Sequence, residues 1–170
     1  YSIWVYVDSW NTNTEKVVFH RKYDTKLYLD ENNSKLMLKC GSSESTGDTY
    51  SNTIEVVNNF PLQKWVHILI SYDNNICDIY LDGKMVKSVQ LSGDPAFNVS
   101  MKDKPINFGS GWDAYISKFE RKPTPTDPKT AYDMYREGSG ATSLGKALGN
   151  YNVNLSFLKD NVETSKFALF

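Results

Sequence analysis

The most regular arrangement of apolar and polar residues lies in the middle of the chain. From Trp65 to Tyr72 nearly every residue is apolar or aromatic, which is typical of a strand covered on both faces. The short polar residues 73–75 predict a turn, and the alternating residues 76–81 predict a return strand. Asp82-Gly83 predicts a tight hairpin, because a type I′ turn needs positive φ at both central residues. We therefore expect a central strand that starts at a largely buried Trp65, then its partner, then a third strand at 84–91.

The same patterns predict strands elsewhere in the chain. Residues Ser2 to Val7 are apolar on both faces, so a second covered strand is expected there. Further strands are predicted at residues 16–21, 26–29, 35–40 and 52–57, and another element at residues 106–117. Short strands separated by polar turns indicate an all-β fold.

One short helix is predicted near residues 127–137. Asp127 suits the N-cap, where a side-chain oxygen accepts hydrogen bonds from free backbone N–H groups. Pro128 suits the first helical position, and Gly138 is a stop signal. The helix would present an apolar stripe of Ala131, Met134 and Tyr135.

The end of the chain predicts a C-terminal β-hairpin. Four apolar residues alternate with polar ones, as in a half-buried strand, namely Tyr151, Val153, Leu155 and Phe157. Because an isolated hairpin is marginally stable in water, we expect residues 150–170 to pack on the same domain. The Gly- and Ser-rich residues 139–149 predict a flexible link. The expected organisation is a single domain with its core at residues 1–138.

Six residues in the middle of the chain resemble a known family pattern. The sequence W-V-H-I, a polar turn and I-Y-L-D-G-K-M-V are similar to the core of laminin-G-like, concanavalin-A-like domains. The matching residues are Trp65, His67, Tyr80, Asp82, Gly83 and Lys84. The resemblance implies an all-β, two-sheet antiparallel jelly-roll sandwich, with a short helix where the chain predicts one. The C-terminal hairpin is not part of that broader pattern.

Longer segments resemble a narrower family. They are Y-S-I-W-V-Y-V at residues 1–7, P-L-Q-K-W-V at 61–66, D-P-K-T-A-Y-D-M-Y at 127–135 and L-K-D-N-V-E at 158–163. Together they are similar to the concanavalin-A-like virion proteins of large nucleocytoplasmic DNA viruses. This resemblance implies a non-enzymatic structural or interaction module, a minor capsid or membrane-associated protein in the capsid or at the internal viral membrane. The implied partners are capsid proteins or other virion proteins, and the viral membrane through an N-terminal segment that is not in this chain.

A glycan-binding lectin domain of a viral surface or extracellular protein is the alternative. The chain begins at Tyr1 inside an apolar strand and without an initiator Met, so we expect the protein to begin earlier. A membrane anchor there would favour the virion role, and a cleavable signal would favour the lectin. Sugar binding needs exposed aromatic rings, and Trp10, Tyr50 and Trp112 lie in or beside predicted loops. These three residues are the predicted contacts with a glycan or a partner.

Composition narrows the range of partners. A chain of 170 residues with 40% hydrophobic residues fits one globular domain. Its 19 basic and 20 acidic residues give a net charge of −1, which argues against a nucleic-acid partner. No apolar run is long enough to span a membrane. Cys40 and Cys77 are consistent with two reduced, buried thiols or with a single disulfide, and their spacing excludes a C-x-x-C site.

No group of residues predicts catalysis. Glucanases of this architecture need two carboxylates on one face of a strand, and the Glu-x-Asp pattern does not occur in the sequence. His20 and His67 belong to no metal-binding or catalytic motif, and we interpret His67 as a structural imidazole. We expect no cofactor. Calcium is the alternative, with oxygen ligands drawn from the loop residues Asp48, Asp94, Asp103 and Asp113.

Overall fold

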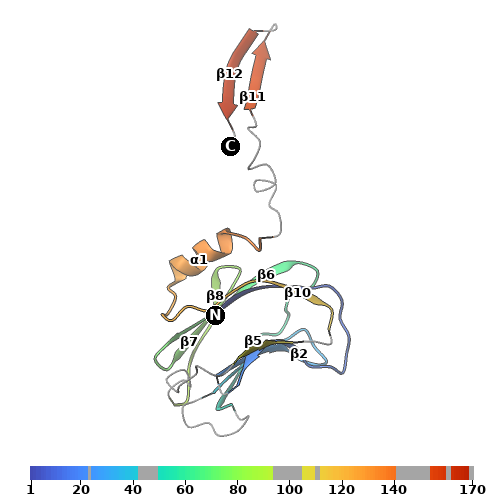
Figure 1. Ribbon diagram of the computed structural model, residues 1–170, viewed down its shortest axis with the longest axis vertical. Coiled ribbons are helices and arrows are strands. Elements are labelled where there is room, and N and C mark those ends of the chain that lie inside the picture. Colours follow the sequence, from blue (N-terminus) through green and yellow to red (C-terminus); the bar gives the residue numbers. More distant parts are fainter. Residues whose placement is uncertain are drawn as a thin grey trace. The chain divides into compact units, whose positions relative to one another are not determined.

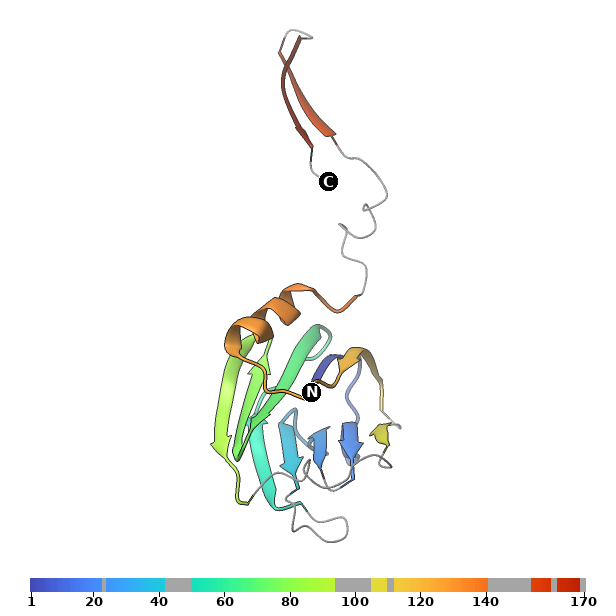
Figure 2. The same ribbon diagram turned by 60° about the vertical axis from the view of Figure 1, so that its left-hand side comes forward.

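The strands form two five-stranded antiparallel sheets that face each other (Figure 1, Figure 2). The computed structural model describes residues 1–22, 24–41, 50–93, 105–109, 112–140, 154–159 and 162–168. The chain divides into two compact units, Tyr1–Ser139 and Gly140–Phe170. Both five-stranded sheets belong to the first unit, and they confirm the predicted jelly-roll sandwich.

The first sheet has the predicted central strand in its middle. Its order is β10-β1-β6-β7-β8. The strands are β10 (Ala114–Glu120), β1 (Ser2–Val7), β6 (Trp65–Asp73), β7 (Ile76–Leu81) and β8 (Lys84–Gln90). Between β7 and β8, Asp82 has a φ of 48° and Gly83 a φ of 73°. The predicted tight turn with two positive φ angles is therefore confirmed.

The second sheet has the order β5-β4-β3-β2-β9. Its strands are β5 (Asn52–Val57), β4 (Leu36–Cys40), β3 (Thr25–Leu29), β2 (Lys16–Arg21) and β9 (Ile106–Phe108). The element predicted at residues 106–117 is thus two strands in different sheets, β9 and β10. Gly109 ends β9 where the backbone passes very close to β2, since a Cβ atom at this position would lie 1.7 Å from the Val17 carbonyl oxygen. Only glycine fits such an approach, and the next strand along the chain, β10, belongs to the first sheet.

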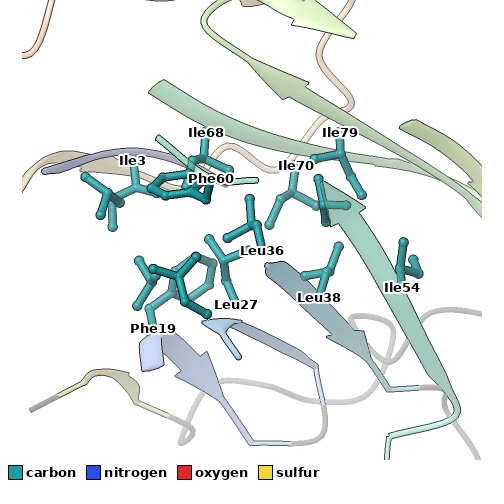
Figure 3. Close-up of a cluster of buried hydrophobic side chains, with 14 of the residues drawn as sticks. Ile3, Phe19, Leu27, Leu36, Leu38, Ile54, Phe60, Ile68, Ile70 and Ile79 are labelled. Carbon is teal, nitrogen blue, oxygen red and sulfur yellow. The ribbon is translucent and has the colours of Figure 1, made fainter. Parts of the chain in front are cut away.

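The core lies between the two sheets (Figure 3). Ile68 and Ile70 of β6 meet Leu36 and Leu38 of β4 there, and all four side chains are buried. Leu69 points to the opposite face of β6 but is also only 1% exposed. Both faces of β6 are therefore covered at this point, which explains the unbroken apolar run in its sequence.

The helix α1 (Pro128–Arg136) supplies the outer cover. Its Ala131 packs with Leu69 and Tyr80, and all three are buried. The Asp127 carboxylate accepts hydrogen bonds from the backbone N–H groups of residues 129 and 130, at 2.9 and 3.0 Å. The predicted N-cap and the predicted position of the helix are confirmed.

Trp65 is partly buried and more exposed than the fully buried residues that follow it on β6, so the expectation of a largely buried side chain is met in part. Tyr135 of α1 stacks on Trp4 and lies over His67, which pair with each other across β1 and β6. Trp65 belongs to the next pair on this face, beyond these helix contacts, and it packs on Tyr6 instead.

The second unit contains a two-stranded antiparallel hairpin. Its strands are β11 (Asn154–Lys159) and β12 (Val162–Ala168), which pair directly. The C-terminal hairpin predicted from the sequence is therefore confirmed as secondary structure. The link predicted at residues 139–149 lies outside the described residues except at its first two positions. Packing of the hairpin on the core domain stays a prediction.

Candidate functional site

Three aromatic side chains form a row across the outer face of the first sheet. Tyr6 on β1 pairs with Trp65 on β6 and with Tyr115 on β10. Residues paired directly across antiparallel strands share a face, and Tyr6 shares its face with Trp4, which contacts the helix. The ring centroids of Tyr6 and Trp65 are 5.7 Å apart, and those of Tyr6 and Tyr115 are 6.1 Å apart. We call Tyr6, Trp65 and Tyr115 the aromatic row.

The aromatic row is open to solvent. Tyr115 is 58% exposed, the highest value among the large hydrophobic side chains of the described residues, and Tyr6 and Trp65 are half-buried. Single exposed apolar residues are common on soluble proteins, whereas contiguous ones mark binding surfaces more often. The rings are inclined to one another by 55° and 60°, so the row is a ridged surface and not a flat plate.

Polar groups lie at two sides of the row. Asp113 is two residues before Tyr115 in the sequence, and its carboxylate accepts a hydrogen bond from the Ser9 hydroxyl at 2.9 Å. Lys64 is adjacent to Trp65, and its ammonium lies 3.3 Å from the Asp82 carboxylate. The Ser9–Asp113 and Lys64–Asp82 contacts are solvent-accessible and can be exchanged for contacts with a ligand, although the Asp82 carboxylate also accepts a hydrogen bond from the His67 backbone N–H at 2.9 Å. Aromatic faces next to hydrogen-bonding groups suit a ligand that has apolar faces and polar edges.

The predicted contact residues Trp10 and Trp112 lie at the same end of the sandwich as the row. The Lys16 ammonium stands over the Trp10 ring, 4.1 Å from its centroid. The Trp112 indole N–H donates to the Val17 carbonyl oxygen at 3.1 Å. Both tryptophans also pack against the core, so each ring is already engaged on one side by the protein.

The third predicted contact, Tyr50, lies elsewhere. It precedes β5, whose first residue Asn52 pairs with Cys40 at the end of β4. The antiparallel register places that end of the second sheet opposite the end that holds Lys16 and Val17. The structure therefore brings Trp10 and Trp112 together and separates Tyr50 from them. Whether these three residues contact a ligand stays a prediction.

His67 has the buried, hydrogen-bonded environment expected of a structural imidazole. Its Nε2 lies 2.8 Å from the Ser2 hydroxyl oxygen, and burial lowers its pKa to about 4, so it is neutral at pH 7. A serine beside a neutral histidine is the first requirement of a nucleophilic site. Here, however, Ser2 is 5% and His67 1% exposed, and Trp4 and Tyr135 cover the imidazole. Ser2 also lines the cavity described below, but the imidazole itself is covered by these two rings.

Of the four aspartates predicted as calcium ligands, only Asp113 lies among the described residues. Asp48, Asp94 and Asp103 lie outside them. Within the described ranges, no three His, Cys, Asp or Glu side chains are grouped closely enough to hold a metal ion. No helix in the same ranges is long and apolar enough to cross a membrane.

A cavity of about 130 Å³ opens at the other end of β1, between the ends of β6 and β10. Its polar lining is engaged within the protein, because the Ser71 hydroxyl oxygen accepts from the Thr126 N–H at 2.8 Å and Arg121 Nε donates to the Tyr1 hydroxyl at 3.3 Å. The aromatic row is the better candidate than this cavity, since it combines accessible rings with exchangeable polar groups.

Sequence comparison identifies a family for most of the first unit. The family described as the concanavalin A-like lectin/glucanases superfamily matches residues 1–120. No curated protein sequence matches the chain significantly.

Solved structures resemble the chain at low sequence identity. A protein from Bacteroides ovatus ATCC 8483 assigned to carbohydrate binding has a TM-score of 0.59 and 11% identity, over 78% of this chain and 39% of its own. The binding domain of Paraclostridial mosquitocidal protein 1 has a TM-score of 0.59 and 13% identity, over 80% and 36%. The binding domain of botulinum neurotoxin DC, solved with SialylT, has a TM-score of 0.56 and 15% identity, over 80% and 34%. The chain spans well under half the length of each, and the likeness concerns the fold alone.

Proposed function

The chain belongs to the concanavalin A-like lectin/glucanases superfamily, and on that basis we propose that it is a carbohydrate-binding domain without catalytic activity of its own. Glycan binding was the alternative that the sequence left open, and here it becomes the main function. Fold alone does not determine function, so a specific surface has to support it. The observation that carries it is the aromatic row of Tyr6, Trp65 and Tyr115.

The chemistry of the aromatic row suits a sugar. One face of a pyranose ring carries mainly C–H groups, which pack well on an aromatic face, while the hydroxyl groups at the ring edge need hydrogen-bonding partners. Asp113 and Ser9 offer such partners on one side of the row, and Lys64 and Asp82 offer them on another. A glycan seated on the row would stack on Tyr115 first, since that ring is the most exposed.

The absence of the Glu-x-Asp pattern supports a non-catalytic role. Retaining and inverting glycosidases both place two carboxyl groups on either side of the scissile bond. Asp113 and Asp82 flank the row, but Asp113 is engaged with Ser9, and Asp82 with Lys64 and the His67 backbone N–H. We therefore assign these groups to ligand contact and not to acid–base chemistry.

Binding to an array of neutral and sialylated oligosaccharides, followed by calorimetry with the best ligand, tests the proposal. Tyr115→Ala should weaken binding roughly tenfold, because a stacked aromatic ring contributes about 0.5–1.5 kcal/mol beyond its buried area. Ile76→Ala is the control, since Ile76 is an exposed apolar residue (44%) that pairs with Asp73, at the opposite end of β6 from Trp65. Equal affinities for the two variants, or no binding to any glycan, would refute the proposed function.

A second role, as a structural component of a virion, rests on the resemblance of the sequence to virion proteins of large DNA viruses. The specific observation in its favour is the C-terminal hairpin, which forms a compact unit of its own and could serve as an assembly element. Capsid proteins and an internal viral membrane are then its expected partners. Locating the protein within intact particles by immunogold labelling tests this role, which does not conflict with glycan binding by the first unit.

A further inference from the structure

Cys40 and Cys77 are buried on opposite sides of the same core. Cys40 is the last residue of β4 in the second sheet, and Cys77 lies in β7 of the first sheet. Their side chains are 1% and 0% exposed, and both belong to the cluster between the sheets. Both are free thiols in this structure. Neither residue takes part in the aromatic row, so carbohydrate binding does not account for them.

Tyr72 connects the two cysteines. It lies directly opposite Cys77 in the β6–β7 pair, so both side chains share the inward face. The Tyr72 hydroxyl reaches the second sheet, where it lies 3.2 Å from Cys40 Sγ and 3.0 Å from Thr25 Oγ1. Thr25 is in turn the cross-strand partner of Cys40. The register of one sheet and the contacts of the other therefore place both thiols beside the same tyrosine.

The surroundings of Cys77 also keep its thiol protonated. A hydrogen bond with Cys40 and then burial raise the pKa of the Cys77 thiol far above its ordinary value. The Cys77 thiolate is consequently scarce at neutral pH, and exchange with external disulfides is slow while the protein is folded. The two sulfur atoms of a disulfide are about 2.0 Å apart, so the two thiols, which are free in this structure, have to come together for the bond to form.

We propose that Cys40 and Cys77 are a disulfide-forming pair that covalently joins the two sheets of the sandwich when the chain folds in the presence of a disulfide oxidant. With glutathione disulfide, one cysteine thiolate attacks a glutathione sulfur, forms a mixed disulfide and releases one glutathione thiolate. The second cysteine thiolate then attacks the mixed disulfide, which forms the Cys40–Cys77 bond and releases the second glutathione. The two protons lost by the cysteines end on the two glutathione thiolates, and two electrons pass to glutathione disulfide.

The pair reacts during folding and not afterwards. Both thiols are reachable by glutathione only while the sheets are apart, because the native exposure of each is close to zero. Once formed, the bond would be protected by the same burial from reduction. It would close a long loop that contains β5 and β6, and such a closure stabilises a protein mainly by restricting its unfolded state.

The experiment is refolding of the full chain from denaturant, with reduced and oxidised glutathione or with reductant alone. The expected product in the glutathione buffer is a monomer that has lost two hydrogen atoms by intact mass, yields a Cys40–Cys77 linked peptide and has no thiol titratable after denaturation. Its melting temperature should exceed that of the reduced monomer by on the order of 10 °C. A natively folded product that keeps both thiols free, or that carries only glutathione adducts, would overturn the proposal.

Single substitutions provide the controls. Cys40→Ser and Cys77→Ser each leave one thiol, so neither can form the intramolecular bond, and the oxidant should not change their melting temperatures. If either variant fails to fold, the comparison of oxidised and reduced wild-type protein still decides the outcome. If the oxidant raises the melting temperature of a single variant as much as that of the wild type, the stabilisation does not come from this pair. That result would refute the proposal.

Discussion

Two alanine substitutions on β6, Trp65→Ala and Ile68→Ala, distinguish a residue of the aromatic row from a residue of the core. Trp65 is half-buried and packs on Tyr6, whereas Ile68, three residues later on β6, is fully buried in the core. Truncation of a fully buried tryptophan costs about 3–5 kcal/mol. Trp65 is partly exposed, and that range already includes ring contacts such as the one with Tyr6, so the expected cost of Trp65→Ala lies below it, at about 2 kcal/mol.

Ile68→Ala is the matched comparison. It removes a side chain with 0% exposure from the middle of the core, so its expected cost is about 3–4 kcal/mol within the range for buried isoleucine. The side chain is smaller than that of tryptophan, yet the greater cost is expected because the cavity cannot be filled by water or by movement of a surface neighbour.

Urea denaturation followed by far-UV circular dichroism measures both costs and does not depend on tryptophan fluorescence. Because the m-value scales with the surface exposed on unfolding, equal m-values would show that both variants expose the same area when they unfold. Glycan affinity is measured in parallel under conditions where both variants are fully folded: Trp65→Ala should lose binding, and Ile68→Ala should retain it. If Trp65→Ala is at least as destabilising as Ile68→Ala and leaves binding unchanged, Trp65 is a core residue and the reasoning for the aromatic row fails.

Other predictions concern the helix, the histidine, the hairpin and catalysis. Gly83→Ala should cost about 1–3 kcal/mol, because Gly83 has positive φ and a Cβ would lie 3.1 Å from the Tyr132 Cα. Gly138→Ala is the control for backbone strain alone, since Gly138 has the same φ of +73° and nothing lies within 4 Å of its Cβ position. Equal melting temperatures of the two variants would contradict the clash with α1. Burial lowers the His67 pKa from 6.5 to about 4, so the unfolded chain binds more protons between these values; stability should be fully present above pH 6.5 and fall as the pH drops towards 4, and urea titrations should show a weaker pH dependence in His67→Gln. Deleting residues 150–170 should lower the melting temperature of the core if the hairpin packs on it; an unchanged value with loss of the protein from assembled particles would instead assign the hairpin to assembly. Incubation with β-glucans should release no reducing sugar, and release that is lost on replacing one carboxylate would reveal an active site.

Features encoded by neighbouring residues could be predicted from the sequence. The turn at Asp82-Gly83 has positive φ at both residues because Asp and Gly tolerate that conformation. The helix begins after Asp127 because this side chain satisfies free backbone N–H groups. In each case the cause lies within a few residues of the effect, so a local pattern was sufficient.

The aromatic row could not be predicted in the same way. Tyr6, Trp65 and Tyr115 lie far apart in the sequence, and they become neighbours only through the register of β1 with β6 and of β1 with β10. Register is a property of two strands together. The loop tryptophans were more conspicuous, but the Lys16 ammonium over Trp10 and the hydrogen bond from Trp112 to Val17 also arise from long-range contacts.

The position of the helix explains why the proposed binding surface lies where the apolar strand β6 begins. Along the outer face of the first sheet, α1 covers Leu69 and then the Trp4–His67 pair. The next pair, Tyr6 and Trp65, continues the same line of cross-strand contacts outside that cover. If packing alone had determined these positions, polar residues would serve better here, since exposed aromatic rings favour aggregation. Aromatic residues on three adjacent strands, at the point where the helix contacts stop, are therefore better explained by a ligand that takes over the cover of the sheet.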